Sequence, residues 1–584
     1  MIAQNRIRLI VCLSFLIWAK KTFFFFNLHY YSDRIKKMLS RFLNSQTRTV
    51  TFAAILLAVS ALISRFLGLV RDRLLAGKFG AGEELDIYFA AFRIPDFVYG
   101  ILIMGGVAAV FLPVFSEYFK KEQEQAWEFV SNLLNCFFIL LVIVCGILAL
   151  FTPQLVNLIS PGFSPENKEL TVTLTRIMFL SPIFFGLSSV FSGMLHYFNR
   201  FLAYSLVPVI YNLGIIFGIL FLVPIFGLNG LAYGVILGAA LHWLFQLPVA
   251  RAAGYKYRPV LNFRSSGLLK VFKLMVPRTI GAAAYHVNLI VITAIASTLT
   301  AGSIAIFNFA NNLQYFPIGL IGVSFSVAAF PALTKVWASG QKEEFFKVFS
   351  SIFRQILFLI IPISILVFIL RAQIVRLVLG TGEFGWLETR LTAASLGIFS
   401  LSVFAASFVP FMARVFYSFH DTKTPLLASL FSMALNVLLC FSFVFFLGFP
   451  NSFQEFTVEA LKLQGIDNIS VIGLPLALSL SAVFQFFLLL FFLKRKTGSL
   501  GNGEVLRSFG KIMAAGILMA ISLYFSLYLA AGFLDTGTTV GILLQIMIAS
   551  LVGFAVYVLA TLLLKSPEIK IIWFSLVGQF KKQH

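Results

Sequence analysis

Long apolar segments recur along nearly the whole chain, and they restrict the fold more than any other feature. A transmembrane helix needs about 20 apolar residues, and about fourteen segments reach that length. Hydrophobic residues make up 59% of the 584 residues and charged residues 12%, whereas soluble domains carry roughly 25% charged residues. The sequence therefore predicts an all-α, polytopic membrane protein.

Weak internal repetition divides the chain into two similar halves. Residues 108–115 resemble residues 327–333, and residues 196–200 resemble residues 416–425. Repeated halves with a site at their interface are typical of secondary transporters. We expect two six-helix lobes followed by two further helices. The expected boundaries are residues 49–252 for the first lobe, 253–497 for the second, and 498–584 for helices 13 and 14 with a basic tail.

The basic segment at residues 1–48 is set apart from this core. Its apolar run, Leu9–Ala19, is short for a span and lacks a small-residue cleavage site. A secretory signal is not favoured. A start codon assigned too far upstream, with Met38 as the natural initiator, is the alternative.

The net charge of +22 has a topological explanation. Basic residues cluster between the apolar segments, as in cytoplasmic loops, and not in a nucleic-acid-binding stretch. An even number of spans then puts both termini in the cytoplasm of a multi-pass plasma or inner membrane protein. Two outer segments break the rule, at residues 71–78 and 371–390.

Catalytic and cofactor signatures are missing from the sequence. The four cysteines lie apart in apolar runs, and the six histidines are dispersed, so neither a metal site nor a cofactor is expected. No phosphate-binding loop and no nucleophile with a partnered base can be assembled. We expect a transporter and not an enzyme.

The second span carries charge at bilayer depth, which costs about 2.5 to 3.5 kcal/mol on insertion scales. Asp86, Arg93 and Met104 share one helical face. Pro95 deprives the carbonyl of Ala91 of its normal donor, which predicts a kink. Arg93 would face a water-filled cavity and contact an anion. The alternatives are an arginine that reaches the lipid headgroups or pairs with Asp86.

The first span adds three more charges. Arg65 and Asp72 fall on one stripe, and Arg71 is expected to point elsewhere. Arg65 could reach the cavity. Arg71 and Asp72 are placed at the end of the span, where they would form an ion pair that fixes the turn or act in gating.

Polar residues also mark the seventh and eighth spans. Arg278 follows Pro277 directly in an otherwise apolar run. The eighth span carries a polar stripe with spacing i, i+3, i+4 and i+7, which would line the cavity or hold neighbouring helices together. Its members are Asn308, Asn311, Asn312 and Tyr315.

Five motifs resemble those of the MurJ (MviN) lipid II flippases of the MOP transporter superfamily. They are Ser64-Arg65-Phe66-Leu67-Gly68-Leu69-Val70-Arg71-Asp72, Phe89-Ala90-Ala91-Phe92-Arg93-Ile94-Pro95, Phe111-Leu112-Pro113-Val114-Phe115, Ser160-Pro161-Gly162-Phe163 and Asp421-Thr422-Lys423-Thr424-Pro425. The resemblance extends from about residue 49 to the C-terminus. It implies fourteen helices, alternating access, and transfer of an undecaprenyl-linked peptidoglycan precursor (lipid II) to the outer leaflet. Cell-wall synthesis or division proteins would be further partners.

The resemblance also implies roles for single residues. Arg65, Arg71, Asp72, Asp86 and Arg93 match charged positions of the family. Tyr99, Met104 and Asn312 stand where the family usually has arginine, glutamate and arginine. We hypothesise that Arg278 restores a pyrophosphate-facing cation opposite Arg93, because guanidinium forms a rigid fork that suits phosphate. The last two helices would help to form a groove for the lipid tail.

The sequence thus predicts a lipid II flippase with a cationic cavity. An exporter of another lipid-linked oligosaccharide and a non-transporting scaffold with a decayed cavity remain the alternatives, and the basic cavity argues against cationic drugs. The expected substrate contacts are Arg65, Arg93, Tyr99, Arg278, Asn308, Asn311, Asn312 and Tyr315, and the expected gate or structural residues are Arg71, Asp72, Asp86 and Pro95.

Overall fold

The computed structural model describes residues 50–101, 108–498, 502–569 and 571, and every regular element within them is a helix. Eleven helical segments are long and apolar enough to cross a membrane. Together with α3 (Val50–Phe79), the pair α4 (Glu83–Tyr99) and α5 (Ala108–Lys121), and α14 (Ser266–Ala296), they agree with the predicted all-α membrane fold.

The eleven segments are built from single helices or from helices that follow one another directly. In the first half they are α6 (Gln123–Leu150), α8 (Pro165–Met178) with α9 (Leu180–Tyr197), α10 (Phe201–Phe217) with η2 (Gly218–Leu222) and α11 (Val223–Phe226), and α12 (Asn229–Leu244) with α13 (Gln246–Ala252). In the second half they are α15 (Ser303–Pro317) with η3 (Ile318–Val323) and α16 (Ser324–Ala338), α17 (Lys342–Ile369), α19 (Trp386–Ser418), α20 (Lys423–Leu447), η4 (Ser470–Ile472) with α22 (Gly473–Thr497), α23 (Asn502–Phe533) and α24 (Thr539–Leu563). Short helices α7 (Thr152–Ile159), α18 (Arg371–Val378) and α21 (Ser452–Leu461) lie between spans.

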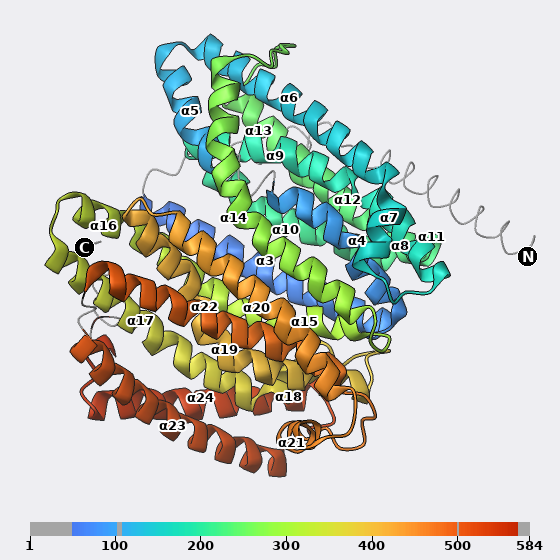
Figure 1. The fold of residues 1–584 in the computed structure, drawn as a ribbon, viewed down its shortest axis with the longest axis vertical. Coiled ribbons are helices and arrows are strands. Elements are labelled where there is room, and N and C mark those ends of the chain that lie inside the picture. The colour runs from blue at the N-terminus through green and yellow to red at the C-terminus, as the bar shows by residue number, and fades with distance from the viewer. Residues whose placement is uncertain (1–49, 102–107, 499–501, 570, 572–584) are drawn as a thin grey trace, which may run out of the picture.

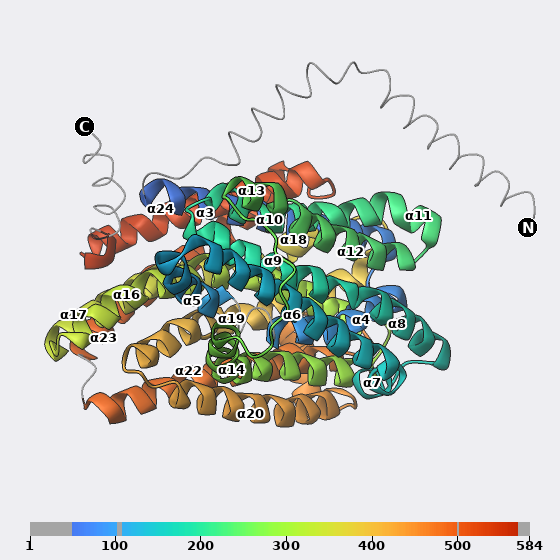
Figure 2. The same cartoon turned by 90° about the horizontal axis from the view of Figure 1, so that it is seen from above.

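The long helices run side by side along a common direction in both views (Figures 1 and 2). In Figure 1, α4–α13 form the upper part and α15–α24 the lower part, with α3 and α14 between them. One hydrophobic cluster is built from α4–α14, one from residues 318–560, and a third from residues of both halves. The start of α14 packs in the first of these through Leu268 and Met275, so this helix contacts both halves.

The neighbouring helix α8 compensates for the proline inside α4. Pro95 lies inside α4 and cannot donate to the carbonyl of Ala91. The hydroxyl of Thr175, on α8, donates to that carbonyl at 3.3 Å. A freed backbone group in a membrane helix needs such a partner from a neighbouring helix, so the proline also fixes how α4 packs on α8.

Glycines bring α10 and its continuation η2 into backbone contact with α12. A Cβ added at Gly214 would lie 2.3 Å from the Cα of Gly238, and one at Gly218 would lie 2.5 Å from the Cα of Gly234. Small residues four apart on facing helices allow this close approach in membranes. The first half therefore depends on these positions staying free of side chains.

Gly234→Ala should destabilise the protein, because the added methyl group would lie 2.7 Å from the Cα of Gly218. Overpacking of this kind costs about 1–3 kcal/mol, so the midpoint of thermal unfolding in detergent should fall. Gly510→Ala is the matched control, since nothing lies within 4 Å of its new Cβ. Equal midpoints for the two variants would refute the glycine contact.

Candidate functional site

Two adjoining polar cavities lie where α3, α4, α14 and α15 meet. They enclose about 320 Å³ and about 380 Å³. They share Arg71, Tyr285, Asn311 and Asn312 in their walls, so they form one polar region, called here the central cavity. Its walls carry the arginines Arg65, Arg71 and Arg93 and the aspartates Asp72 and Asp96.

Arg93 lies on α4, in the first half of the chain, and its side chain binds residues of α14 and α15. Its Nε donates to Thr293 Oγ1 at 2.6 Å, and its Nη2 donates to Asn308 Oδ1 at 2.7 Å. Its exposed fraction is 8%, and it lines the central cavity. The alternative in which Arg93 reaches the lipid headgroups does not fit this burial.

Asp86 does not pair with Arg93, and that alternative is wrong. Its two carboxylate oxygens accept from the backbone N–H groups of Gly302 and Ala305, each at 2.8 Å. These groups are the free donors at the start of α15, where a negative charge also interacts favourably with the helix dipole. Asp86 therefore caps a helix of the second half from the first half.

Arg71 and Asp72 lie inside α3 and not at its end, because the helix continues to Phe79. Arg71 Nη2 pairs with Asp72 Oδ1 at 2.8 Å, and Asn312 donates to Asp72 Oδ2 at 3.1 Å. Arg71 also donates to Asn212 at 3.3 Å. The prediction that Arg71 points away from the cavity is wrong, because Arg71 lines both parts of the central cavity. A helical wheel places only the Cβ direction, whereas the long arginine side chain can reach round the helix.

Arg65 and the polar stripe of α15 meet at the other part of the central cavity. Arg65 Nη1 donates to the carbonyls of Phe316 at 2.8 Å and Tyr315 at 3.4 Å. Asn311 accepts from Gln314 at 2.9 Å and lines both parts. The residues that the spacing grouped on α15 are thus brought together with the arginines of α3 and α4.

Three predicted positions stand apart from this set. The Tyr99 ring packs on Phe185 at 4.9 Å between centroids, and Tyr99 is not among the residues that line the central cavity. Met104 and the side chain of Arg278 lie outside the described residues. The cation opposite Arg93 therefore remains a prediction.

Other residues in or next to the cavity wall had no role assigned from the sequence. Thr293 and Asn212 bind the arginines directly, and Tyr211 and His286 line the cavity. Asp96 lines it as well. A rare intramembrane carboxylate could have signalled Asp96, whereas a threonine in an apolar segment gives no such signal.

The end of the bundle next to Asp86 is closed by backbone contacts between the halves. It comprises the links 80–82, 160–164, 297–302 and 379–385 and is called here the sealed end. The N–H of Glu383 donates to the carbonyl of Gly77 at 3.1 Å. A Cβ on Gly302, where φ is +87°, would lie 1.8 Å from the Ala81 carbonyl oxygen. Only glycine permits this approach.

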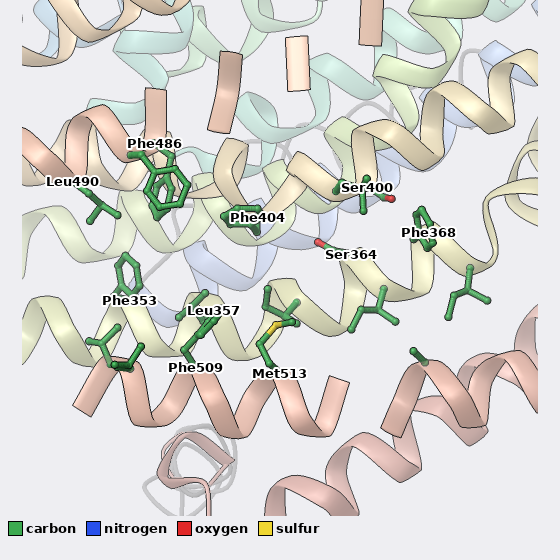
Figure 3. A pocket seen from close by; sticks show the side chains of 18 residues that line it. Phe353, Leu357, Ser364, Phe368, Ser400, Phe404, Phe486, Leu490, Phe509 and Met513 are labelled. Atoms are coloured by element: carbon green, nitrogen blue, oxygen red, sulfur yellow. The ribbon is translucent and has the colours of Figure 1, made fainter. Parts of the chain in front are cut away.

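An apolar groove of about 840 Å³ runs over the second half. It is lined from α17, α19, α22 and α23 by side chains such as Phe353, Phe404, Phe486 and Met513 (Figure 3). The resemblance implied that the last two helices help to form a groove. α23 does so, whereas no residue of α24 is among its lining residues.

The motif at Asp421 has a local structural role. Asp421 accepts from the backbone N–H of Thr424 at 3.0 Å, which satisfies a free donor at the start of α20, and from Lys496 Nζ at 2.7 Å. Burial acts against ionisation, but these hydrogen bonds outweigh it and lower the pKa of the Asp421 carboxyl. The motif ties α20 to α22 away from the central cavity.

The comparisons with known proteins agree on one family. The sequence model described as lipid II flippase MurJ matches residues 75–545. The chain belongs to the MurJ family. A probable lipid II flippase MurJ of Buchnera aphidicola from Acyrthosiphon pisum is 33% identical over 389 residues, which cover 65% of this chain and 76% of that protein. A probable lipid II flippase MurJ of Vibrio cholerae is 28% identical over 431 residues, which cover 71% of this chain and 82% of that protein.

Solved structures agree with the assignment to MurJ. A lipid II flippase MurJ in an inward closed conformation gives a TM-score of 0.69 at 26% identity, covering 90% of this chain and all of the other. A multidrug resistance MATE transporter of the MOP superfamily gives 0.62 at 14% identity over 77% of this chain and 99% of its own, which shows the shared fold. The predicted family is confirmed.

Gly162→Ala should loosen the sealed end. Its φ is not in the left-handed region, but the new Cβ would lie 2.2 Å from the carbonyl oxygen of Ser297, so the links must separate. The rate of maleimide labelling at Thr381→Cys in the purified protein should rise several-fold relative to a Gly146→Ala control, which has nothing within 4 Å of its Cβ. Equal labelling rates would contradict a seal at this place.

Proposed function

We propose that this MurJ-family chain carries lipid II from the cytoplasmic to the outer leaflet by alternating access. The observation that carries the proposal is the central cavity, with Arg65, Arg71 and Arg93 in its walls at the junction of the two halves. The relatives are named as flippases of this lipid. On the charge of the loops, both termini face the cytoplasm.

The arginines suit a pyrophosphate because guanidinium N–H groups form charge-assisted hydrogen bonds with phosphate oxygens. Arg93 uses Nε and Nη2 for Thr293 and Asn308. Within the described residues Nη1 makes no hydrogen bond, so its two N–H groups remain available for an anion. Arg93 would thus bind the lipid phosphate while its other donors hold α14 and α15.

The apolar groove would take the prenyl chain. Aromatic and aliphatic side chains line it along most of its length (Figure 3), and they would contact a polyisoprenoid by dispersion and burial. The headgroup would meet hydrogen-bonding residues in the central cavity, and the chain would stay in an apolar environment. This division of the substrate avoids moving charge through lipid.

The central cavity is too small for the whole headgroup in this conformation. Its parts of about 320 and 380 Å³ lie near the lower end of pockets for drug-sized ligands, and a disaccharide-peptide is larger. The two halves must therefore separate to admit the substrate. The sealed end would close one side of the membrane while the other side opens.

A strain depleted of its own lipid II flippase provides the test. The wild-type gene should restore growth, and Arg93→Met should reduce colony formation by at least about tenfold, because charge-assisted hydrogen bonds of roughly 1.5–3 kcal/mol are lost. Arg176→Met is the control, since the Arg176 guanidinium is hydrogen-bonded too, to the backbone carbonyl of Ala149 at 3.1 Å, but lies outside the cavity.

Membrane levels of each variant should be compared by immunoblot. Rescue by Arg93→Met at equal levels would show that this charge is not needed and would contradict its role in binding the lipid phosphate. Failure of the well-expressed wild-type chain to restore growth would favour the exporter of another lipid-linked oligosaccharide or the scaffold.

A further inference from the structure

A second cationic pocket lies at the end of the bundle beside α18, separate from the central cavity. It encloses about 700 Å³ and is formed by α18, the start of α19, the end of α21, α23 and the start of α24. It shares no lining residue with the central cavity. Its cations are Arg371, Arg376, Arg390 and Lys462, and no aspartate or glutamate lines it.

The three arginines of this pocket donate to backbone carbonyls and not to carboxylates. Arg376 donates to the carbonyl of Thr536 at 2.8 Å, and Arg390 donates to that of Gln464 at 3.0 Å. None of the ion pairs in the described part of the chain involves the four cations. Cations at this end also depart from the positive-inside pattern, so a negative ligand would account for their presence.

Two aromatic side chains place the pocket at the membrane surface. Trp386 and Tyr524, both lining residues, are 64% and 63% exposed. Tryptophan and tyrosine gather where a membrane meets water, and the Arg390 guanidinium lies 4.3 Å from the Trp386 ring centroid. The four cations are therefore at the level of lipid headgroups.

The pocket is continuous with the apolar groove. Ile369 lines both. Phe368 lines the groove, while its carbonyl accepts from Arg371 at 2.8 Å and its ring lies 5.0 Å from that guanidinium. A ligand that combines an anionic head with a long apolar chain would fit across this junction.

We propose that this pocket binds an anionic phospholipid of the phosphatidylglycerol type, with its phosphate among the four cations and one acyl chain at the Ile369 end of the groove. The phosphate is the only charge of this headgroup, which matches a lining with four cations and no aspartate or glutamate. The buried amide oxygen of Gln373, a lining residue, has no partner within the described residues, and a glycerol hydroxyl would donate to it. The headgroup site shares no lining residue with the central cavity, while the acyl chain would use one end of the groove proposed for the prenyl chain.

Native mass spectrometry of the purified, delipidated full chain tests the site. Phosphatidylglycerol should bind at least about tenfold more tightly than phosphatidylcholine with the same chains. The double variant Arg376→Gln, Arg390→Gln should lose this preference, and Arg176→Gln should retain it. Equal binding of the two lipids, or an unchanged preference in the double variant, would overturn the proposal.

A single substitution and a competition experiment test the same site independently. Lys462→Asn removes an exposed charge at a residue with φ of +57°, which asparagine tolerates, so it should weaken phosphatidylglycerol binding without unfolding the chain. If the double variant misfolds, unchanged binding by Lys462→Asn overturns the proposal. A polyprenyl phosphate that displaces phosphatidylglycerol at equal concentration would overturn the assigned occupant.

Discussion

The buried guanidinium of Arg93 is the interaction on which the rest of the structure depends. A charge at this depth is tolerated only with hydrogen-bonding partners or water around it. Thr293 and Asn308 supply two of those partners from α14 and α15. The same contacts bind the first half of the chain to the second, so a substrate phosphate that attracts Arg93 would also act on how the halves are held together.

The closure of the sealed end follows from a second set of backbone contacts. Asp86 caps α15 from α4, and the glycines of the links allow backbones to approach without side chains between them. Such contacts are formed or broken as a unit, because a close-packed interface has few intermediate arrangements. They give the molecule a discrete closed state at one end, next to a central cavity that is smaller than its proposed cargo.

The sequence predicted the helical membrane fold from the length of its apolar segments. It also predicted much of the cavity wall, because the spacing of polar residues along a helix shows which of them share a face. Arg65, Arg93 and Asn308 were found in this way. Partners across helices were not predictable. Asp86 was considered as a partner of Arg93 but caps α15, and Arg71 was expected off the cavity but lines it. Contacts of this kind depend on which helices become neighbours, which helical periodicity does not encode.

Contacts across helices were also not predictable at the positions where the resemblance implies a different residue. Tyr99, where the resemblance implies a cation, packs on Phe185, while Asn312 donates to Asp72. Asp96 adds a carboxylate to the wall, and Thr293 accepts a hydrogen bond from Arg93. The cavity thus retains its cationic character through arginines of α3 and α4.

Transport of fluorescent lipid II in proteoliposomes tests the central claim most directly. The rate at which the lipid becomes accessible to a membrane-impermeant quencher should be about tenfold lower for Arg93→Met than for the wild type. A fluorescent phosphatidylethanolamine should not be moved by either protein. Equal lipid II rates for the two proteins, or equally fast movement of phosphatidylethanolamine, would contradict a cationic cavity that carries the lipid headgroup.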